Sequence, residues 1–96
     1  MSLLDIFRRK NIDIEAERRE RLLQHGRITD GIVMDIGAEE TGDPHVIYYN
    51  YSVSGVDYES SQTLNDEQQN RPHEYAPGAT INVRFDPRQP GNSVVV

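Results

Sequence analysis

The side chains that could bind a metal ion gather in one stretch of this 96-residue chain, from Gly37 to His45. His45 follows three carboxylates there, at Glu39, Glu40 and Asp43. Calcium sites need six or more oxygen ligands, usually with Asp or Asn at alternate positions of a loop. This stretch lacks that alternation, so we expect a solvated hairpin tip that holds no metal ion.

Residues capable of catalysis are present, but their spacing matches no known site. No histidine stands beside Ser52, Ser54, Ser60 or Ser61, and the chain contains neither a G-x-S-x-G motif nor a glycine-rich phosphate loop. It has no cysteine, which excludes disulfides and thiolate metal sites. We therefore expect a protein that is not an enzyme, with no catalytic residue and no cofactor.

The distribution of charge argues against nucleic acid as a partner. The net charge is -6, but residues 1–27 hold seven Arg or Lys against five Asp or Glu, whereas residues 28–96 hold three against eleven. A surface this acidic repels phosphate backbones.

Five segments have the alternation and the boundaries of β-strands, and the sequence places them at 27–36, 46–53, 56–64, 80–86 and 93–96. Pro77-Gly78 predicts a tight turn before the fourth strand. Asp86-Pro87 should end that strand, and Pro90-Gly91-Asn92 should form the turn before the fifth. Gly31 is expected to mark a bulge or a bend in the first strand.

The second and third strands flank Ser54-Gly55, a two-residue loop typical of tight antiparallel hairpins. If Val53 pairs with Val56, then Tyr51 lies opposite Tyr58, and Tyr49 opposite Ser60. The bulky side chains then share one face, whereas a slip by one residue would divide them between two.

A helix is predicted from Asn11 to His25, with Asn11 or Asp13 as its N-cap and Gly26 just past its end. Its apolar face is thin, so the helix either lies loosely on the sheet or pairs with a second copy of the chain. The polar stretch from Asn65 to Glu74 is predicted to be a long mobile loop.

These elements predict a mainly β fold: a small five-stranded antiparallel β-barrel or curved sheet with one N-terminal α-helix. We assign residues 1–26 to the N-terminal arm and helix and residues 27–96 to the barrel domain. The predicted core comprises Ile28, Ile32, Met34, Ile47, Tyr49, Tyr51, Val53, Val56, Tyr58, Ile81, Val83, Phe85 and Val95, with Leu22 and Leu23 from the helix.

Tyr48 should point away from the core face of its strand, where it either marks a protein contact or is covered by the helix or a loop. The first ten residues are apolar and then basic; Leu4 and Phe7 belong to this arm. Tyr48, Phe7 and Leu4 are therefore the candidate interaction surface. The arm could also touch a membrane surface, or it could be a frayed terminus or a short helix packed on the barrel.

Four groups of residues, in this order, resemble the Domain of Unknown Function 3592 family over about residues 27–96: Gly31-Ile32-Val33, Tyr49-x-Tyr51-x-Val53-x-Gly55-x-x-Tyr58, Tyr75-x-Pro77-Gly78, and Val83-Arg84-Phe85-Asp86-Pro87-x-x-Pro90. The resemblance implies a small bacterial β-domain without an assigned activity, commonly found next to transmembrane helices and outside the cytoplasm. This chain departs from that pattern because it carries no such helix. The family brings no catalytic residues.

We therefore expect a non-enzymatic interaction or structural module that binds a protein partner or a second copy of itself. The alternative is a ligand-binding or hydrolytic domain whose mouth is formed by residues 37–45 and 65–74. The sequence alone favours a cytoplasmic protein, and the resemblance favours one adjacent to a membrane.

Overall fold

The computed structural model describes the backbone of residues 3–38 and 44–96 and the side chains of residues 14–37 and 45–96. The chain folds as one long helix, α1 (Leu3–His25), followed by five strands. The strands are β1 (Arg27–Ala38), β2 (Pro44–Val53), β3 (Val56–Thr63), β4 (Thr80–Asp86) and β5 (Gln89–Val95), with the short helices α2 (Asp66–Gln69) and η1 (Pro72–Tyr75) between β3 and β4.

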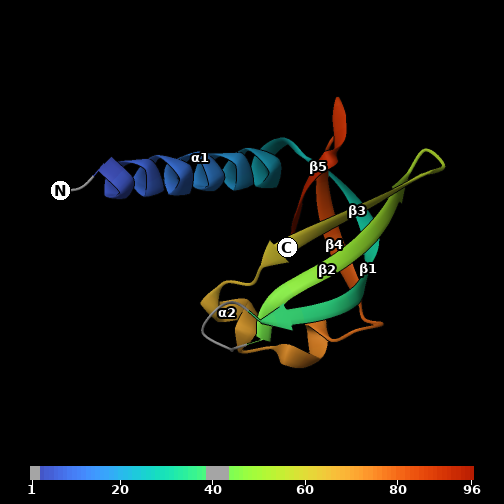
Figure 1. Ribbon diagram of the computed structural model, residues 1–96. Helices are drawn as coiled ribbons and strands as arrows, with labels where there is room; N and C mark the ends of the chain where they lie inside the picture. The colour runs from blue at the N-terminus through green and yellow to red at the C-terminus, as the bar shows by residue number, and fades with distance from the viewer. Residues whose placement is uncertain (1–2, 39–43) are drawn as a thin grey trace.

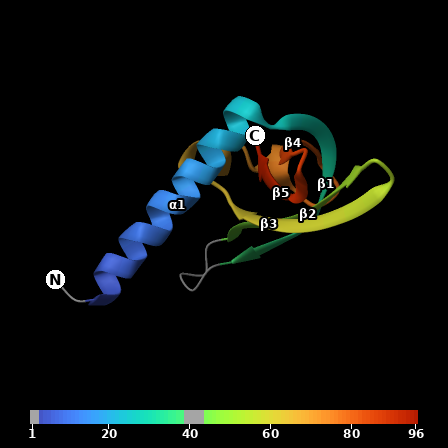
Figure 2. The ribbon, with the colours of Figure 1, turned by 90° about the horizontal axis from the view of Figure 1, so that it is seen from above.

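The five strands form one antiparallel sheet in the order β3-β2-β1-β4-β5. The sheet curls until it is a nearly closed barrel, with β3 and β5 as its two edges (Figure 1, Figure 2). The predicted fold class, a mainly β barrel or curved sheet preceded by one helix, is confirmed.

The predicted hairpin between β2 and β3 is also confirmed, register included. Val53 pairs with Val56, Tyr51 with Tyr58, and Tyr49 with Ser60. Ser54 and Gly55 both have positive φ angles, of 51° and 81°, as the tight two-residue turn requires.

The prediction for the inner face of β1 was wrong. Ile28, Ile32 and Met34 are 61%, 48% and 56% exposed, whereas Val33 is 1% exposed. Residues directly opposite in a strand pair share one face of the sheet. Ile28 and Ile32 pair with polar residues, and Val33 pairs with the buried Tyr49. Turning the two isoleucines inward would therefore bury polar partners and expose the tyrosine.

A bulge in β1 explains why simple alternation failed there. Val33 pairs with Tyr49 and Asp35 with Tyr48, so Met34 is the extra residue. The bulge therefore lies at Met34 and not at the predicted Gly31. Gly31 has a different role, because a Cβ there would lie 2.8 Å from both the Asn50 carbonyl oxygen and Val83 Cγ2.

The core comprises residues of β1, β2, β4 and β5 together with Leu22 of α1 and two residues of the β3–β4 connection: Leu22, Val33, Ile47, Tyr49, Tyr51, Leu64, Tyr75, Ile81, Val83, Phe85, Val94 and Val95. Most of the predicted core is confirmed. Leu23 and Val56 are corrections, because they are 45% and 52% exposed.

Two element boundaries, the starts of α1 and β5, differ from the prediction by more than two residues. α1 begins at Leu3, so Asn11 and Asp13 lie inside it and are not N-caps. β5 begins at Gln89, because the turn is made at Pro87 and Arg88, with the Arg88 amide donating to Asp86 Oδ1 at 2.8 Å. The Pro90-Gly91-Asn92 segment is accordingly strand. Proline is tolerated there because β5 is an edge strand.

The segment predicted to be a mobile loop is ordered structure. Asn65 caps α2 by accepting from the Gln68 amide at 2.8 Å, and the Asn65 amide donates to Gln68 Oε1 at 3.0 Å. Gln68 and Tyr75 are buried. The turn at Pro77-Gly78 is confirmed, with a φ of 89° at Gly78 and a hydrogen bond of 2.9 Å from the Ala79 amide to the Ala76 oxygen.

The open seam between β3 and β5 is bridged by side chains. The Gln62 amide group pairs with the backbone of Val95, donating to its oxygen at 3.1 Å and accepting from its N–H at 2.8 Å. The hydroxyl groups of Tyr49 on β2 and Ser93 on β5 also form a hydrogen bond, of 2.7 Å. Tyr51 donates to the Pro90 oxygen at 2.5 Å, and burial raises the pKa of this phenol, which keeps it protonated.

The described side chains of α1 are those of its C-terminal half, from Ile14 onward, and this half contacts the sheet. Its contacts are mainly with β4 and β5, and Arg19 Nη2 also donates to the Thr63 oxygen of β3 at 3.5 Å. Leu22 is its one buried residue among the described side chains. Figures 1 and 2 both show the N-terminal half projecting beyond the sheet. Within the described residues, no helix combines the length and apolar character needed to cross a bilayer.

Candidate functional site

Tyr48 lies on the outer face of the barrel, as the sequence predicted. Its side chain is 48% exposed, so neither α1 nor the described connections cover it. The ring rests over Gly37, where a Cβ would lie 3.1 Å from Tyr48 Cε2. A side chain at position 37 would therefore crowd the tyrosine ring.

Tyr48 is one of three exposed apolar side chains that we call the outer patch: Ile32, Met34 and Tyr48. Met34 and Tyr48 line an open cavity of about 340 Å³ together with Glu59 and Ser61 of β3. The bulge at Met34 creates this arrangement, because the extra residue of β1 lies directly beside Tyr48 of β2. Exposed apolar clusters of this kind are typical of contact surfaces.

The rim of the outer patch is acidic. Asp30 and Asp35 flank it along β1, and Glu59 borders the cavity from β3; all three are exposed. The outer patch therefore combines an apolar centre with a negative border.

The other two residues of the predicted interaction surface, Leu4 and Phe7, belong to the first two turns of α1. Their side chains lie outside the described residues. The residues grouped with Tyr48 are instead Ile32 and Met34, which the sequence prediction had placed in the core. The sequence alone did not reveal their orientation, because it follows from the register with the neighbouring strands: Ile32 lies opposite Asn50, a polar residue on the outer face of β2.

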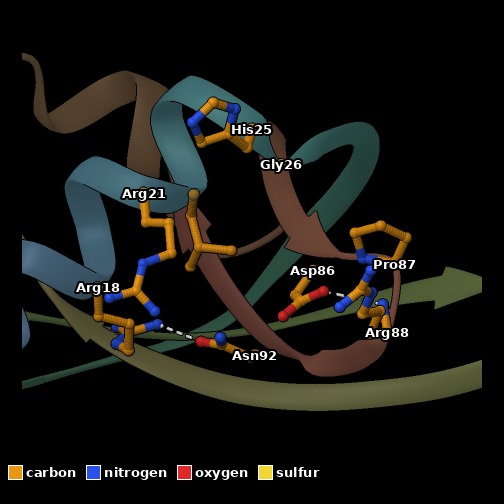
Figure 3. Close-up of a pocket in the computed structure, with 9 residues that line it drawn as sticks. Arg18, Arg21, His25, Gly26, Asp86, Pro87, Arg88 and Asn92 are labelled. Atoms are coloured by element: carbon orange, nitrogen blue, oxygen red, sulfur yellow. Dashed lines mark hydrogen bonds between the residues drawn. The ribbon is translucent and has the colours of Figure 1, made fainter.

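A second cavity, of about 410 Å³, lies where the C-terminal half of α1 meets the β4–β5 turn; we call it the helix–turn cleft. Figure 3 shows its basic residues, with Arg18, Arg21 and His25 on the helix side and Arg88 on the turn side. Asp86 is the one acidic residue among those that line it.

Arg18 holds the helix against β5. Its Nη1 donates to Asn92 Oδ1 at 2.8 Å and to the Ser93 oxygen at 3.0 Å. Its Nε and Nη2 donate to the Glu15 carboxylate at 3.0 and 2.6 Å. The hydrogen bond from Arg18 lowers the pKa of Glu15 below its ordinary value. Arg19 also pairs with Glu15, at 3.2 Å, across an i,i+4 spacing on the helix.

The alternative site, a mouth formed by residues 37–45 and 65–74, is described only in part. Residues 39–43, which include all three carboxylates of the predicted hairpin tip, lie outside the described residues. The second segment forms α2 and η1. Within the described ranges, no group of three or more His, Cys, Asp or Glu side chains could hold a metal ion.

Sequence reasoning missed the structural role of Gln62. The predicted hairpin already placed this residue opposite Ile47, on the inner face, and a polar side chain at an inner position indicates a buried hydrogen-bonding role. The helix–turn cleft had no comparable signal, because it depends on where α1 lies against the sheet.

Comparison with known proteins gives one match. The family model described as Domain of unknown function (DUF3592) matches residues 24–96, from the last turn of α1 through all five strands. No curated protein and no solved structure matches the chain. The fold described above is therefore the fold of the matched region, and this chain belongs to the DUF3592 family of domains of unknown function.

Proposed function

We propose that this protein is a non-enzymatic interaction module and that the outer patch is its recognition surface. The observation that carries the proposal is the exposure of Ile32, Met34 and Tyr48 on the outer face of a sheet whose core is complete without them. Aromatic residues and Met are enriched at protein interfaces, and Tyr48 and Met34 adjoin one cavity.

The acidic rim indicates what kind of segment the outer patch would bind. Asp30, Asp35 and Glu59 would attract Lys or Arg and repel other acidic surfaces. We therefore expect the partner to present apolar side chains flanked by basic ones. A segment of this composition would fill the cavity beside Tyr48 and neutralise its border.

The test places a photocrosslinking amino acid at position 48 of the full chain in its native cell. The matched control places it at position 56, because Val56 is 52% exposed but lies at the far end of β3. We expect a defined protein adduct from position 48 alone, mapped to an apolar and basic segment. Adding Met34→Ser should reduce that adduct severalfold.

Equal labelling from positions 48 and 56, or an adduct that Met34→Ser leaves unchanged, would overturn the proposal. Circular dichroism of each variant shows whether the barrel is retained. Because Met34 and Tyr48 are both about half exposed, their replacement should leave the fold intact.

A further inference from the structure

The helix–turn cleft contains two arginine side chains that the fold does not use. Within the described residues, the guanidinium groups of Arg21 and Arg88 form no hydrogen bond and no ion pair. Arg18 differs, because its hydrogen bonds to Glu15, Asn92 and Ser93 hold α1 on β5. The cleft therefore has one guanidinium held by the fold, that of Arg18, and two, those of Arg21 and Arg88, that bond to no described group.

The concentration of positive charge here contrasts with the acidic character of residues 28–96. The whole chain has a net charge of -6, and residues 28–96 hold only three Arg or Lys. One of those three, Arg88, faces this cavity, and α1 supplies Arg18, Arg21 and His25. Water can hydrogen-bond to an exposed guanidinium anywhere on a protein surface. Here, however, the arginine side chains line one cavity of about 410 Å³, a volume suited to a small ligand.

The one acidic lining residue limits where an anion could lie. The Asp86 Oδ1 accepts the Arg88 backbone amide at 2.8 Å, so this carboxylate is held in place by the turn. In Figure 3 it lies between the helix side and the turn side of the cleft. An anionic group at the centre would meet Asp86, whereas groups at the two ends would meet Arg21 or Arg88.

We propose that the helix–turn cleft binds a small organic anion with two acidic groups, one held by Arg21 and the other by Arg88. Arginine presents paired donors that match carboxylate and phosphate oxygens, so the shared chemistry is an oxyanion. The cleft is separate from the outer patch, and this inference stands independently of the proposed interaction function.

Titration of the full chain at constant ionic strength tests this directly, with citrate and pyrophosphate as probes and acetate as the singly charged control. The readout is the ¹⁵N resonance of each arginine Nε. We expect saturable shifts at Arg21 and Arg88 with citrate, pyrophosphate or both, and much weaker binding of acetate. The tighter of the two probes identifies the ligand's acidic group as carboxylate or phosphate.

Arg21→Gln and Arg88→Gln should each weaken binding roughly tenfold, because each removes a charge-assisted hydrogen-bonding group. Arg27→Gln is the matched control: Arg27 is also exposed and its loss changes the net charge equally, but it does not line the cleft. The affinity of this control variant for each probe should stay within about twofold of that of the unchanged chain.

The proposal would be overturned if the chemical shifts grew linearly with the concentration of both probes. It would also be overturned if Arg27→Gln lost as much binding affinity as Arg21→Gln. Either result would show general attraction of anions to arginine and no defined site. Because Arg21 and Arg88 are exposed and bond to no other described side chain, an unchanged backbone spectrum is expected for each variant and verifies its fold.

Discussion

The side chain of Gln62 pairs with the backbone of Val95 as a strand would. Its Nε2 donates to the Val95 oxygen at 3.1 Å, and its Oε1 accepts from the Val95 amide at 2.8 Å. Gln68 adds a second donor to the same oxygen at 3.3 Å. Gln62 is only 6% exposed, so this pair joins the two edges of the barrel where β3 and β5 form no ladder.

Replacing Gln62 by leucine should destabilise the fold by about 1–3 kcal/mol, because the Val95 amide would be left buried without a partner. Chemical denaturation measures the change. The control is Gln24→Leu on the exposed face of α1, which should change the free energy of unfolding by less than about 0.5 kcal/mol. Equal effects for the two variants would contradict the role assigned to Gln62.

Gly31 should not tolerate alanine. The added Cβ would lie 2.8 Å from the Asn50 oxygen and 2.8 Å from Val83 Cγ2, so β2 or β4 would have to shift. Overpacking of this kind costs about 1–3 kcal/mol. At Gly91 the nearest atom to a Cβ is Tyr58 Cδ1 at 3.7 Å, an ordinary contact. Thermal unfolding should therefore show a large loss for Gly31→Ala and little change for Gly91→Ala.

Gly78 is needed for its backbone conformation and not for space. Its φ is 89°, and no atom lies within 4 Å of the position a Cβ would take. Gly78→Ala should cost roughly 1 kcal/mol, because an L-residue is strained at this φ. Gly78→Asn should cost less, since asparagine tolerates positive φ better. If urea denaturation gave the reverse order, strain would not be the cause.

Stability should depend on pH through Glu15. Its pKa is lowered in the folded protein from the ordinary 4.5, first by the hydrogen bond from Arg18. A carboxyl whose folded pKa is lowered stabilises the fold above its unfolded pKa, and this contribution is lost as pH falls through the folded value. The loss should therefore appear below about pH 4.5.

Glu15→Gln should flatten that acid-side decline, measured as the free energy of unfolding against pH. The effect should be small, because the Glu15 side chain is 46% exposed and solvent screens the ion pair. Glu17→Gln is the matched control on the same helix, since Glu17 has no ion pair among the described residues. A profile changed equally by both would contradict the assignment.

The outer patch and the helix–turn cleft differ in how far the sequence could reveal them. The orientation of Tyr48 followed from alternation alone, because it neighbours Tyr49 on a strand whose register the hairpin determines. Its neighbours Ile32 and Met34 were missed, since their outward orientation depends on the register with β2 and β4. The helix–turn cleft joins residues near position 20 to residues near position 90, and no local pattern indicates that contact.

Local physics decided the hairpin. A two-residue loop at Ser54-Gly55 permits one tight register, and only that register gathers Tyr49, Tyr51 and Tyr58 on one face. The Pro77-Gly78 turn was equally local, because proline fixes its own φ and glycine readily adopts the positive φ of the next position, without help from distant residues.

The inner face of β1 was decided by tertiary structure. Its own residues offer apolar side chains on both faces, Ile28 and Ile32 on one and Val33 on the other. The neighbouring strands determine which face of β1 turns inward, because residues opposite each other share a face of the sheet. β2 and β4 place Tyr51 and Val83 on the inside. The bulge at Met34 then turns Ile36 inward, and the two isoleucines that the core does not need remain on the outer surface.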